Sequence, residues 1–225
     1  MKCFLLCAGF GTRMQELTQN IPKPLLTIQG KSLLEINLQF AYSSGAREFY
    51  INTHYLAEKI EQEVKKFSNY KIFISREEKE ILGTAGGIKT ALAGKISEEE
   101  TFLLINPDSI FYPSKDFSFP RDFQEDLLLY LAPRESTSKN TELSLKNGKV
   151  FFEKGDHYYI GICIMKLKAL KDVPVGKYFD LTEVFKKYSK EGKLLGKVFE
   201  GKVVDLGDKE KYLSNFNLSL PSYVK

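Results

Sequence analysis

The first 75 residues alternate between short apolar runs and segments whose apolar residues recur at helical spacing. Apolar runs at 2–8, 48–52 and 71–75 predict strands, and residues 33–44 and 56–67 show the spacing of amphipathic helices. Ser32 followed by Glu35 is the sequence signature of a capping box at the start of the first helix. A strand–helix–strand–helix–strand order requires parallel strands joined by crossover helices. The sequence therefore predicts an α/β fold with a mixed, mostly parallel sheet flanked by helices.

The second half of the chain continues this pattern only in part. A glycine-rich segment at 83–87 predicts a tight turn, followed by a short helix and a strand at 101–106. From Leu127 onward the predicted strands come closer together, and Asn147-Gly148 is the usual signal of a two-residue hairpin. We therefore expect a smaller antiparallel excursion in this half. The other predicted elements are strand-like segments at 198–205 and helices that begin at Asp180 and Asp208.

The length and charge of the chain limit its domain organisation and its partners. No linker, repeat or low-complexity segment interrupts the 225 residues, so we expect a single domain over residues 1–225. The 33 basic and 29 acidic residues leave a net charge of +4, and only five of the basic residues are Arg. Because Arg is the residue best suited to phosphate-backbone and base contacts, this balance argues against a nucleic-acid-binding protein.

Two features of the sequence concern the cellular compartment. No stretch approaches the ~18 consecutive apolar residues of a membrane span, so no membrane association is expected. The apolar N-terminal run ends at Gly9 without a small-residue cleavage site, which favours the first strand of a cytoplasmic protein over a signal peptide. Cys3, Cys7 and Cys163 lie in apolar runs without zinc-ligand spacing, which predicts inert thiols in the core.

The strongest functional signal follows the first strand, where Gly9-Phe-Gly11-Thr-Arg13 forms a glycine-rich turn. Glycines allow close backbone approach, N–H groups of a turn bind anionic oxygens, and Arg13 adds a fixed positive charge. Pro22-Lys23-Pro24 begins nine residues after Arg13 and supplies a second cation. The dinucleotide fingerprint needs a glycine where Met14 stands, and the P-loop needs a Gly-Lys-Ser/Thr run that this sequence lacks. The combination predicts a site for a polyphosphate.

These motifs resemble those of the sugar-1-phosphate nucleotidyltransferases, which make nucleotide sugars. The resemblance rests on the G-x-G-T-R-[ML] turn, the spaced P-K-P-L, the later Leu82-Gly-Thr-Ala-Gly-Gly87 and a strand-end Asp, and it runs from Lys2 to about Asn215. The chain is similar to compact bacterial members that act on mannose 1-phosphate, heptose 1-phosphate or N-acetylmuramic acid 1-phosphate. The resemblance implies a Rossmann-like fold of GT-A type. It also implies a nucleotide-binding part at about 1–112 and a sugar-binding part at about 113–225.

Carried over motif by motif, the resemblance implies roles for individual residues. Gly83 and Thr84 match the loop that contacts the base or ribose. Glu153 and Lys154 match residues that contact a sugar hydroxyl and a phosphate, and Gly155 stands where the family has proline. The remaining assignments are Ala8, Gly9, Gly11, Thr12 and Arg13 for the nucleotide, Lys23 for phosphate oxygens at the reaction centre, and Gly161 for the sugar.

Two strand-end carboxylates, Asp108 and Asp205, match the residues that the family assigns to a metal. Mg²⁺ prefers hard oxygen ligands and is commonly held by one or two carboxylates together with substrate phosphates. We therefore expect Mg²⁺ on this pair. Pro107 stands where the family usually has glycine, and because proline lacks an N–H, we expect one backbone donor fewer near the sugar.

The resemblance implies that a sugar 1-phosphate oxygen attacks the α-phosphorus of a nucleoside triphosphate and that pyrophosphate leaves. Arg13, Lys23 and Asp108 are the expected catalytic residues. The acceptor phosphate needs no general base, because its second pKa is about 6.

The choice of substrates stays open at this point. We expect guanylyl transfer from GTP to a mannose-like or heptose 1-phosphate, in a monomer or small homo-oligomer that serves cell-envelope polysaccharide synthesis. The alternatives are uridylyl transfer from UTP to N-acetylmuramic acid 1-phosphate, cytidylyl transfer from CTP to phosphocholine, and a non-catalytic nucleotide-sensing homologue.

Overall fold

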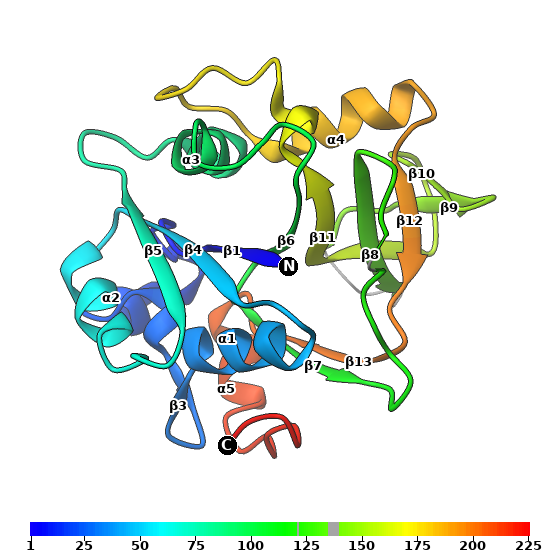
Figure 1. Ribbon diagram of the computed structural model, residues 1–225. Coiled ribbons are helices and arrows are strands. Elements are labelled where there is room, and N and C mark those ends of the chain that lie inside the picture. The colour runs from blue at the N-terminus through cyan, green and yellow to red at the C-terminus, as the bar shows by residue number, and fades with distance from the viewer. Residues whose placement is uncertain (121, 135–139) are drawn as a thin grey trace.

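One mixed sheet organises the molecule. The computed structural model describes residues 1–120, 122–134 and 140–225, and in these residues nine strands pair in the order β5-β4-β1-β6-β11-β8-β12-β10-β9 (Figure 1). β1, β4, β5 and β6 are parallel, and β11 pairs antiparallel with both β6 and β8. The predicted fold class is therefore confirmed. The strands of this sheet are β1 (Lys2–Leu6), β4 (Glu48–Thr53), β5 (Lys71–Arg76), β6 (Thr101–Ile105), β8 (Leu127–Pro133), β9 (Ser144–Lys146), β10 (Lys149–Phe151), β11 (His157–Lys166) and β12 (Leu195–Val198).

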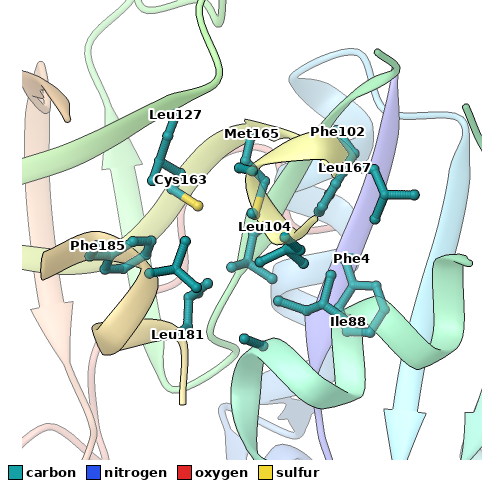
Figure 2. Packing of buried hydrophobic residues seen from close by; sticks show 14 of the residues in the cluster. Phe4, Ile88, Phe102, Leu104, Leu127, Cys163, Met165, Leu167, Leu181 and Phe185 are labelled. Carbon is teal, nitrogen blue, oxygen red and sulfur yellow. The ribbon is translucent and has the colours of Figure 1, made fainter. Parts of the chain in front are cut away.

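Helices cover both faces of the sheet (Figure 1). Side chains alternate along the buried strand β1, so Phe4 packs with Ile88 of α3 and Leu181 of α4, whereas Leu5 packs with Leu34 of α1. Figure 2 shows the first of these two cores, between the sheet and the helices α3 and α4. The helices are α1 (Leu33–Ser43), α2 (Ala57–Val64), α3 (Gly83–Leu92), α4 (Leu181–Lys190) and α5 (Lys209–Ser214), with 3₁₀ helices η1 (Thr12–Thr18), η2 (Lys23–Leu25) and η3 (Leu167–Leu170).

Two short antiparallel pairs lie outside the main sheet. β2 (Thr27–Ile28) and β3 (Lys31–Ser32) form a hairpin, and β7 (Ser109–Pro113) pairs with β13 (Gly201–Asp205). In the second pair Asp205 lies opposite Ser109, although the two residues are far apart in the sequence. This pairing places the end of β13 next to the loop that follows β6.

Several details differ from the sequence prediction. The glycine-rich segment at 83–87 is the first turn of α3 itself, because the segment 177–179 packs against it: a Cβ on Gly86 would lie 2.2 Å from the carbonyl oxygen of Lys177. β12 runs parallel to β8, since the chain returns through α4 between β11 and β12, so the second half is not wholly antiparallel. The Asn147-Gly148 hairpin is confirmed, with φ values of 49° and 73°.

The cysteines agree with the sequence prediction. Cys3, Cys7 and Cys163 are buried and free, and burial raises the pKa of the Cys163 thiol to about 12, which confirms inert core thiols. In the described part of the chain, no helix combines the length and the apolar character needed to cross a bilayer.

Candidate active site

A cleft of about 350 Å³ opens at the carboxyl ends of β1, β4 and β6. In α/β sheets of this kind, ligands bind at the carboxyl ends of parallel strands. The lining residues come from the turn after β1, from η2, from the start of α3 and from the loop after β6. The predicted residues that line the cleft are Ala8, Gly9, Gly11, Thr12, Arg13, Lys23, Gly83, Thr84 and Asp108.

The two glycines of the turn after β1 have different surroundings. Gly11 has a φ of 67°, and a Cβ there would lie 3.2 Å from the Cβ of Lys23 and 3.1 Å from the methyl carbon of Thr18. A Cβ on Gly9 would meet no atom within 4 Å, so no side chain stands between its backbone and the cleft. The Thr18 hydroxyl donates to the Gly11 carbonyl at 3.0 Å and closes the turn. An anionic ligand can therefore approach the backbone closely.

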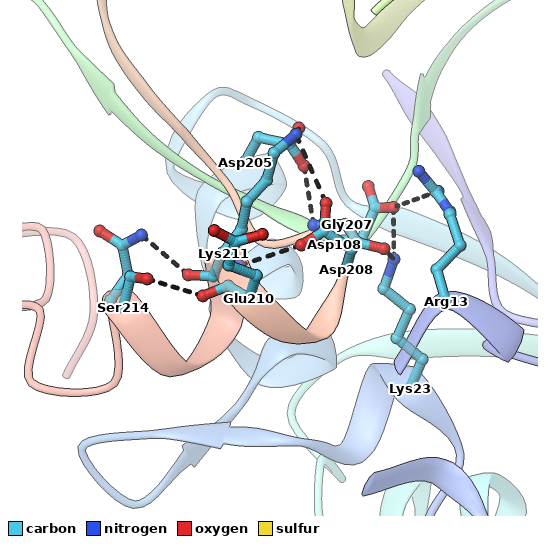
Figure 3. Close-up of polar contacts among 10 residues, drawn as sticks. Arg13, Lys23, Asp108, Asp205, Gly207, Asp208, Glu210, Lys211 and Ser214 are labelled. Carbon is cyan, nitrogen blue, oxygen red and sulfur yellow. Dashed lines mark hydrogen bonds and ion pairs between the residues drawn. The ribbon is translucent and has the colours of Figure 1, made fainter. Parts of the chain in front are cut away.

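The three expected catalytic side chains meet at one point of the cleft (Figure 3). Lys23 Nζ donates to Asp108 Oδ2 at 2.7 Å and to the Gly207 carbonyl at 2.9 Å. Arg13 Nη2 lies 3.9 Å from the same Asp108 oxygen. The Lys23 side chain is only 13% exposed, whereas that of Arg13 is 70% exposed. Lys23 is thus held in place by the protein, and Arg13 is free to reach a ligand.

Asp205 lies beside this group on the end of β13. The Leu206 N–H donates to the Asp108 carbonyl at 2.8 Å, which ties the two loops together. Asp205 Oδ1 accepts from the Gly207 N–H at 2.7 Å, and Oδ2 accepts from Lys211 on α5. Burial is the largest single influence on the pKa of Lys211 and lowers it, but the hydrogen bond to Asp205 and the negative charges of Asp205 and Asp208 together raise it by more, so the net shift is upward. Each carboxylate is therefore already paired with an ammonium group of this chain.

Gly83 and Thr84 join two helices at the edge of the cleft. The Thr84 hydroxyl accepts from the Leu181 N–H at 2.8 Å, which connects the start of α3 to the start of α4. Gly83 has a φ of 69°, and a Cβ there would lie 2.7 Å from the Phe179 carbonyl oxygen. Gly83 and Thr84 therefore both line the cleft and hold the start of α3 against the segment that leads into α4.

A smaller cavity of about 220 Å³ adjoins the cleft and shares Leu6, Thr84 and Asn106 with it. Gly161 lies behind Asn106: it has a φ of 85°, and a Cβ there would lie 3.0 Å from the Asn106 Cβ. Apolar side chains and a few polar ones, among them Asp180, form the rest of this wall. Gly161, the predicted sugar-contacting residue, therefore packs against Asn106, which lines both cavities.

Glu153 and Lys154 lie elsewhere. Both follow β10, and neither lines the cleft or the smaller cavity. The Glu153 carboxylate accepts from the Ser144 hydroxyl at 2.7 Å and from the Lys146 ammonium group, and these bonds lower its pKa. Gly155, at the position of the family's proline, has its backbone against the start of β9, because a Cβ there would lie 2.2 Å from the Leu143 carbonyl oxygen and 2.6 Å from the Ser144 nitrogen.

Pro107 forms part of the cleft wall between Asn106 and Asp108. The Asp108 N–H donates to the Asn106 carbonyl at 2.8 Å across the proline, in a tight turn. The proline that replaces the family's glycine thus belongs to the turn that carries Asp108.

Sequence reasoning missed two side chains of this region, Asn52 and Lys211. Asn52 is the last residue but one of β4 and lines the cleft, and its position just after an apolar run was the same signal that identified Asp108. Lys211 gave no such signal, since it lies within a short charged helix and reaches Asp205 only through the packing of α5.

Comparisons with known proteins agree with this architecture. A family model described as nucleotidyl transferase matches residues 2–125. The chain is 28% identical over 246 residues to the mannose-1-phosphate guanylyltransferase catalytic subunit beta of Danio rerio. This match covers 99% of this chain but only 65% of that protein. It is 28% identical over 228 residues to the N-acetylmuramate alpha-1-phosphate uridylyltransferase of Caulobacter vibrioides, with 93% of each chain covered.

A third relative and a solved structure match over nearly their whole length. The D-glycero-alpha-D-manno-heptose 1-phosphate guanylyltransferase of Campylobacter jejuni is 27% identical over 220 residues, which cover 94% of this chain and 97% of that protein. The crystal structure of HddC from Yersinia pseudotuberculosis superposes with a TM-score of 0.78 at 24% identity, over 96% of this chain and 97% of the other. HddC has also been solved in complex with GMP-PN, with a TM-score of 0.77 to this chain. The structural similarity establishes the fold.

Proposed function

Because the chain belongs to the nucleotidyl transferase family, we propose that it transfers a nucleotidyl group from a nucleoside triphosphate to a sugar 1-phosphate. The products are a nucleotide sugar and pyrophosphate. The observation that carries the proposal is the convergence of Arg13, Lys23 and Asp108 beside the glycine-rich turn. A polyphosphate that enters this cleft meets backbone N–H groups, two cations and a carboxylate in one place.

The residues of the cleft serve charge neutralisation and positioning. Attack of one phosphate on another is opposed by the repulsion of their negative charges, which fixed cations reduce. Lys23, held by Asp108 and Gly207, neutralises oxygens at the reaction centre, and the exposed Arg13 binds the departing pyrophosphate. The attacking phosphate is ionised near neutral pH, because its second pKa is about 6, so the reaction needs no general base.

Asp108 and Asp205 fit a hard divalent cation such as Mg²⁺. Carboxylate oxygens are the ligands that Mg²⁺ prefers, and the pairing of β7 with β13 brings these two carboxylates into neighbouring loops. Since Mg²⁺ is commonly held by one or two carboxylates together with substrate phosphates and water, Asp108 and Asp205 would supply the protein's part of such a site. When bound, Mg²⁺ neutralises phosphate charge.

The relatives support a guanylyl transfer to a mannose-like or heptose 1-phosphate. Two of the three compared relatives carry guanylyltransferase in their names, one for mannose 1-phosphate and one for a manno-heptose 1-phosphate. Uridylyl transfer to N-acetylmuramic acid 1-phosphate is the second candidate, because the Caulobacter relative of that activity matches over 93% of both chains. The acceptor lies in the smaller cavity beside Asn106, and the nucleotide lies in the cleft.

The test is pyrophosphate release by the purified protein with Mg²⁺. GTP, UTP, CTP, ATP and dTTP are crossed with mannose 1-phosphate, a manno-heptose 1-phosphate, N-acetylmuramic acid 1-phosphate and phosphocholine. The proposal predicts release that requires both a nucleotide and a sugar 1-phosphate, fastest with GTP. Silence across the panel, with a nucleotide still raising the melting temperature, would favour a non-catalytic nucleotide-binding protein.

A further inference from the structure

Asn52, which lines the cleft, forms a buried polar pair with Glu77, which lies behind it and does not line the cleft. Asn52 lies between the glycine-rich turn and the loop at Gly83–Thr84, and it is 2% exposed. Glu77 follows β5 and is 5% exposed, and within the described residues its carboxylate makes no ion pair. A buried carboxylate that is kept beside a cleft without a cation is costly unless hydrogen bonds hold it.

The hydrogen bonds of this pair fix the orientation of the Asn52 amide. Asn52 Oδ1 accepts from the Cys7 N–H at 2.9 Å, and Nδ2 donates to Glu77 Oε1 at 2.8 Å. Glu77 Oε2 accepts from the Leu82 N–H at 2.7 Å. A backbone N–H can only donate, so a flipped Asn52 amide would place its NH2 group against the Cys7 N–H, two donors facing each other. The second Nδ2 proton of Asn52 is therefore available to a ligand, and because an amide nitrogen cannot accept, this group acts only as a donor.

We propose that Asn52, oriented by Glu77, reads the nucleobase. Its second Nδ2 proton donates to the carbonyl that guanine carries as O6 and uracil as O4, where adenine and cytosine carry an amino group. An amino group at that position would place two donors against each other and leave both unsatisfied. This inference rests on the proposed function, and the names of the relatives agree with it, because guanylyl- and uridylyltransferases both use bases with this carbonyl.

The same geometry allows the polarity of the pair to be exchanged. In the double variant N52D/E77Q, the new carboxylate at position 52 still accepts from the Cys7 N–H and now accepts from the side-chain amide at position 77. The oxygen of that amide still accepts from the Leu82 N–H. Every bond of the network is kept, and the formal charge is unchanged, but the group that faces the cleft becomes an acceptor. The double variant should therefore prefer an amino base.

Nucleotide affinity, measured by calorimetry with Mg²⁺ and no acceptor, tests the proposal on the unmodified protein first. ITP lacks the 2-amino group of GTP, and 2,6-diaminopurine riboside triphosphate carries an amino group in place of the O6 carbonyl. UTP and CTP differ in the same way, with a carbonyl or an amino group at position 4. We expect ITP to bind like GTP. The diaminopurine analogue should bind at least about 10-fold more weakly than GTP, and CTP at least about 10-fold more weakly than UTP. This is the factor that one lost hydrogen bond gives.

The variants then test the role of the pair. N52D/E77Q should bind the diaminopurine analogue better than GTP, and the single variant E77Q should lose affinity for GTP and melt at a lower temperature. The charge-matched control N69D/E80Q changes exposed residues outside the cleft and should behave like the unmodified protein. Equal affinity of the unmodified protein for the carbonyl and amino bases would refute the inference and leave the proposed function intact. If none of the nucleotides bound, the proposed function would fail with it. If the double variant did not fold, the analogue series alone would decide.

Discussion

Replacing Lys23 by methionine removes the cation that the protein holds most firmly in the cleft. The ammonium group makes two charge-assisted bonds, at 2.7 Å to Asp108 and 2.9 Å to the Gly207 carbonyl. Such bonds contribute about 1.5–3 kcal/mol each, but the Asp108 side chain is 24% exposed, and water replaces part of what is lost. We therefore expect the free energy of unfolding to fall by about 1–2 kcal/mol, which lowers the melting temperature by roughly 2–8 °C.

The effect of this variant on turnover should be much larger than its effect on stability. Loss of one preorganised charge-stabilising donor costs about 2.7–4 kcal/mol in the transition state, a factor of about 10²–10³ in rate. K23M should therefore lose about 10²–10³-fold in kcat/KM for pyrophosphate release while its melting curve stays cooperative.

A matched control separates the site effect from the loss of any lysine. Lys31 also makes a 2.7 Å ion pair, with Glu35, but its side chain is 35% exposed and does not line the cleft. K31M should retain full activity and lose at most about 0.5 kcal/mol of stability. Activity of K23M within tenfold of the unmodified protein would refute the assignment of Lys23 to the reaction centre, as would an equal loss in K31M.

Three further predictions follow from the packing and the charges. G86A should lower the free energy of unfolding by about 1–3 kcal/mol and the melting temperature by roughly 2–12 °C, because its Cβ would lie 2.2 Å from the Lys177 carbonyl oxygen. Alanine is the better helix former, so a higher melting temperature would contradict this contact. K211M should tighten Mn²⁺ binding, measured by electron paramagnetic resonance, because it frees Asp205 from its ammonium partner, and weaker binding would show that Lys211 assists the metal instead. Burial raises the pKa of the Cys163 thiol to about 12, so the neutral thiol dominates at pH 8. Cys163 should therefore resist iodoacetamide at pH 8 until the protein unfolds, and rapid labelling of the folded protein would contradict its burial.

The parallel half of the fold could be predicted from the sequence because its signals are local. Each buried strand is a continuous apolar run, and the helix that begins after Ser32 carries its cap in the sequence, where the Ser32 hydroxyl accepts from the Glu35 N–H at 3.1 Å. The cleft follows from the same rule, since residues just after parallel strands meet at one edge of the sheet. The glycine-rich turn and Asp108 were identified in this way.

The contacts that the sequence did not reveal depend on partners far along the chain. The turn predicted at 83–87 is helical because the segment 177–179 packs against it, and this tertiary contact overrides the local glycine signal. Lys211 lies only six residues after Asp205, but their contact depends on how the chain turns between β13 and α5, which no residue pattern indicates. The buried link from Asn52 to Glu77 joins the ends of β4 and β5, which no local pattern can pair. Conversely, Glu153 and Lys154 match a family motif, but the structure holds Glu153 by Ser144 and Lys146, outside both cavities.

The fate of the individual phosphates of the nucleotide tests the central claim most directly. The purified protein is incubated with Mg²⁺, a sugar 1-phosphate and GTP that carries ³²P at either the α or the γ position, and the products are separated. Attack on the α-phosphorus predicts that the α label appears in the nucleotide sugar and the γ label in pyrophosphate, in equal amounts. Transfer of the γ label to the sugar, or its release as free phosphate, would contradict nucleotidyl transfer.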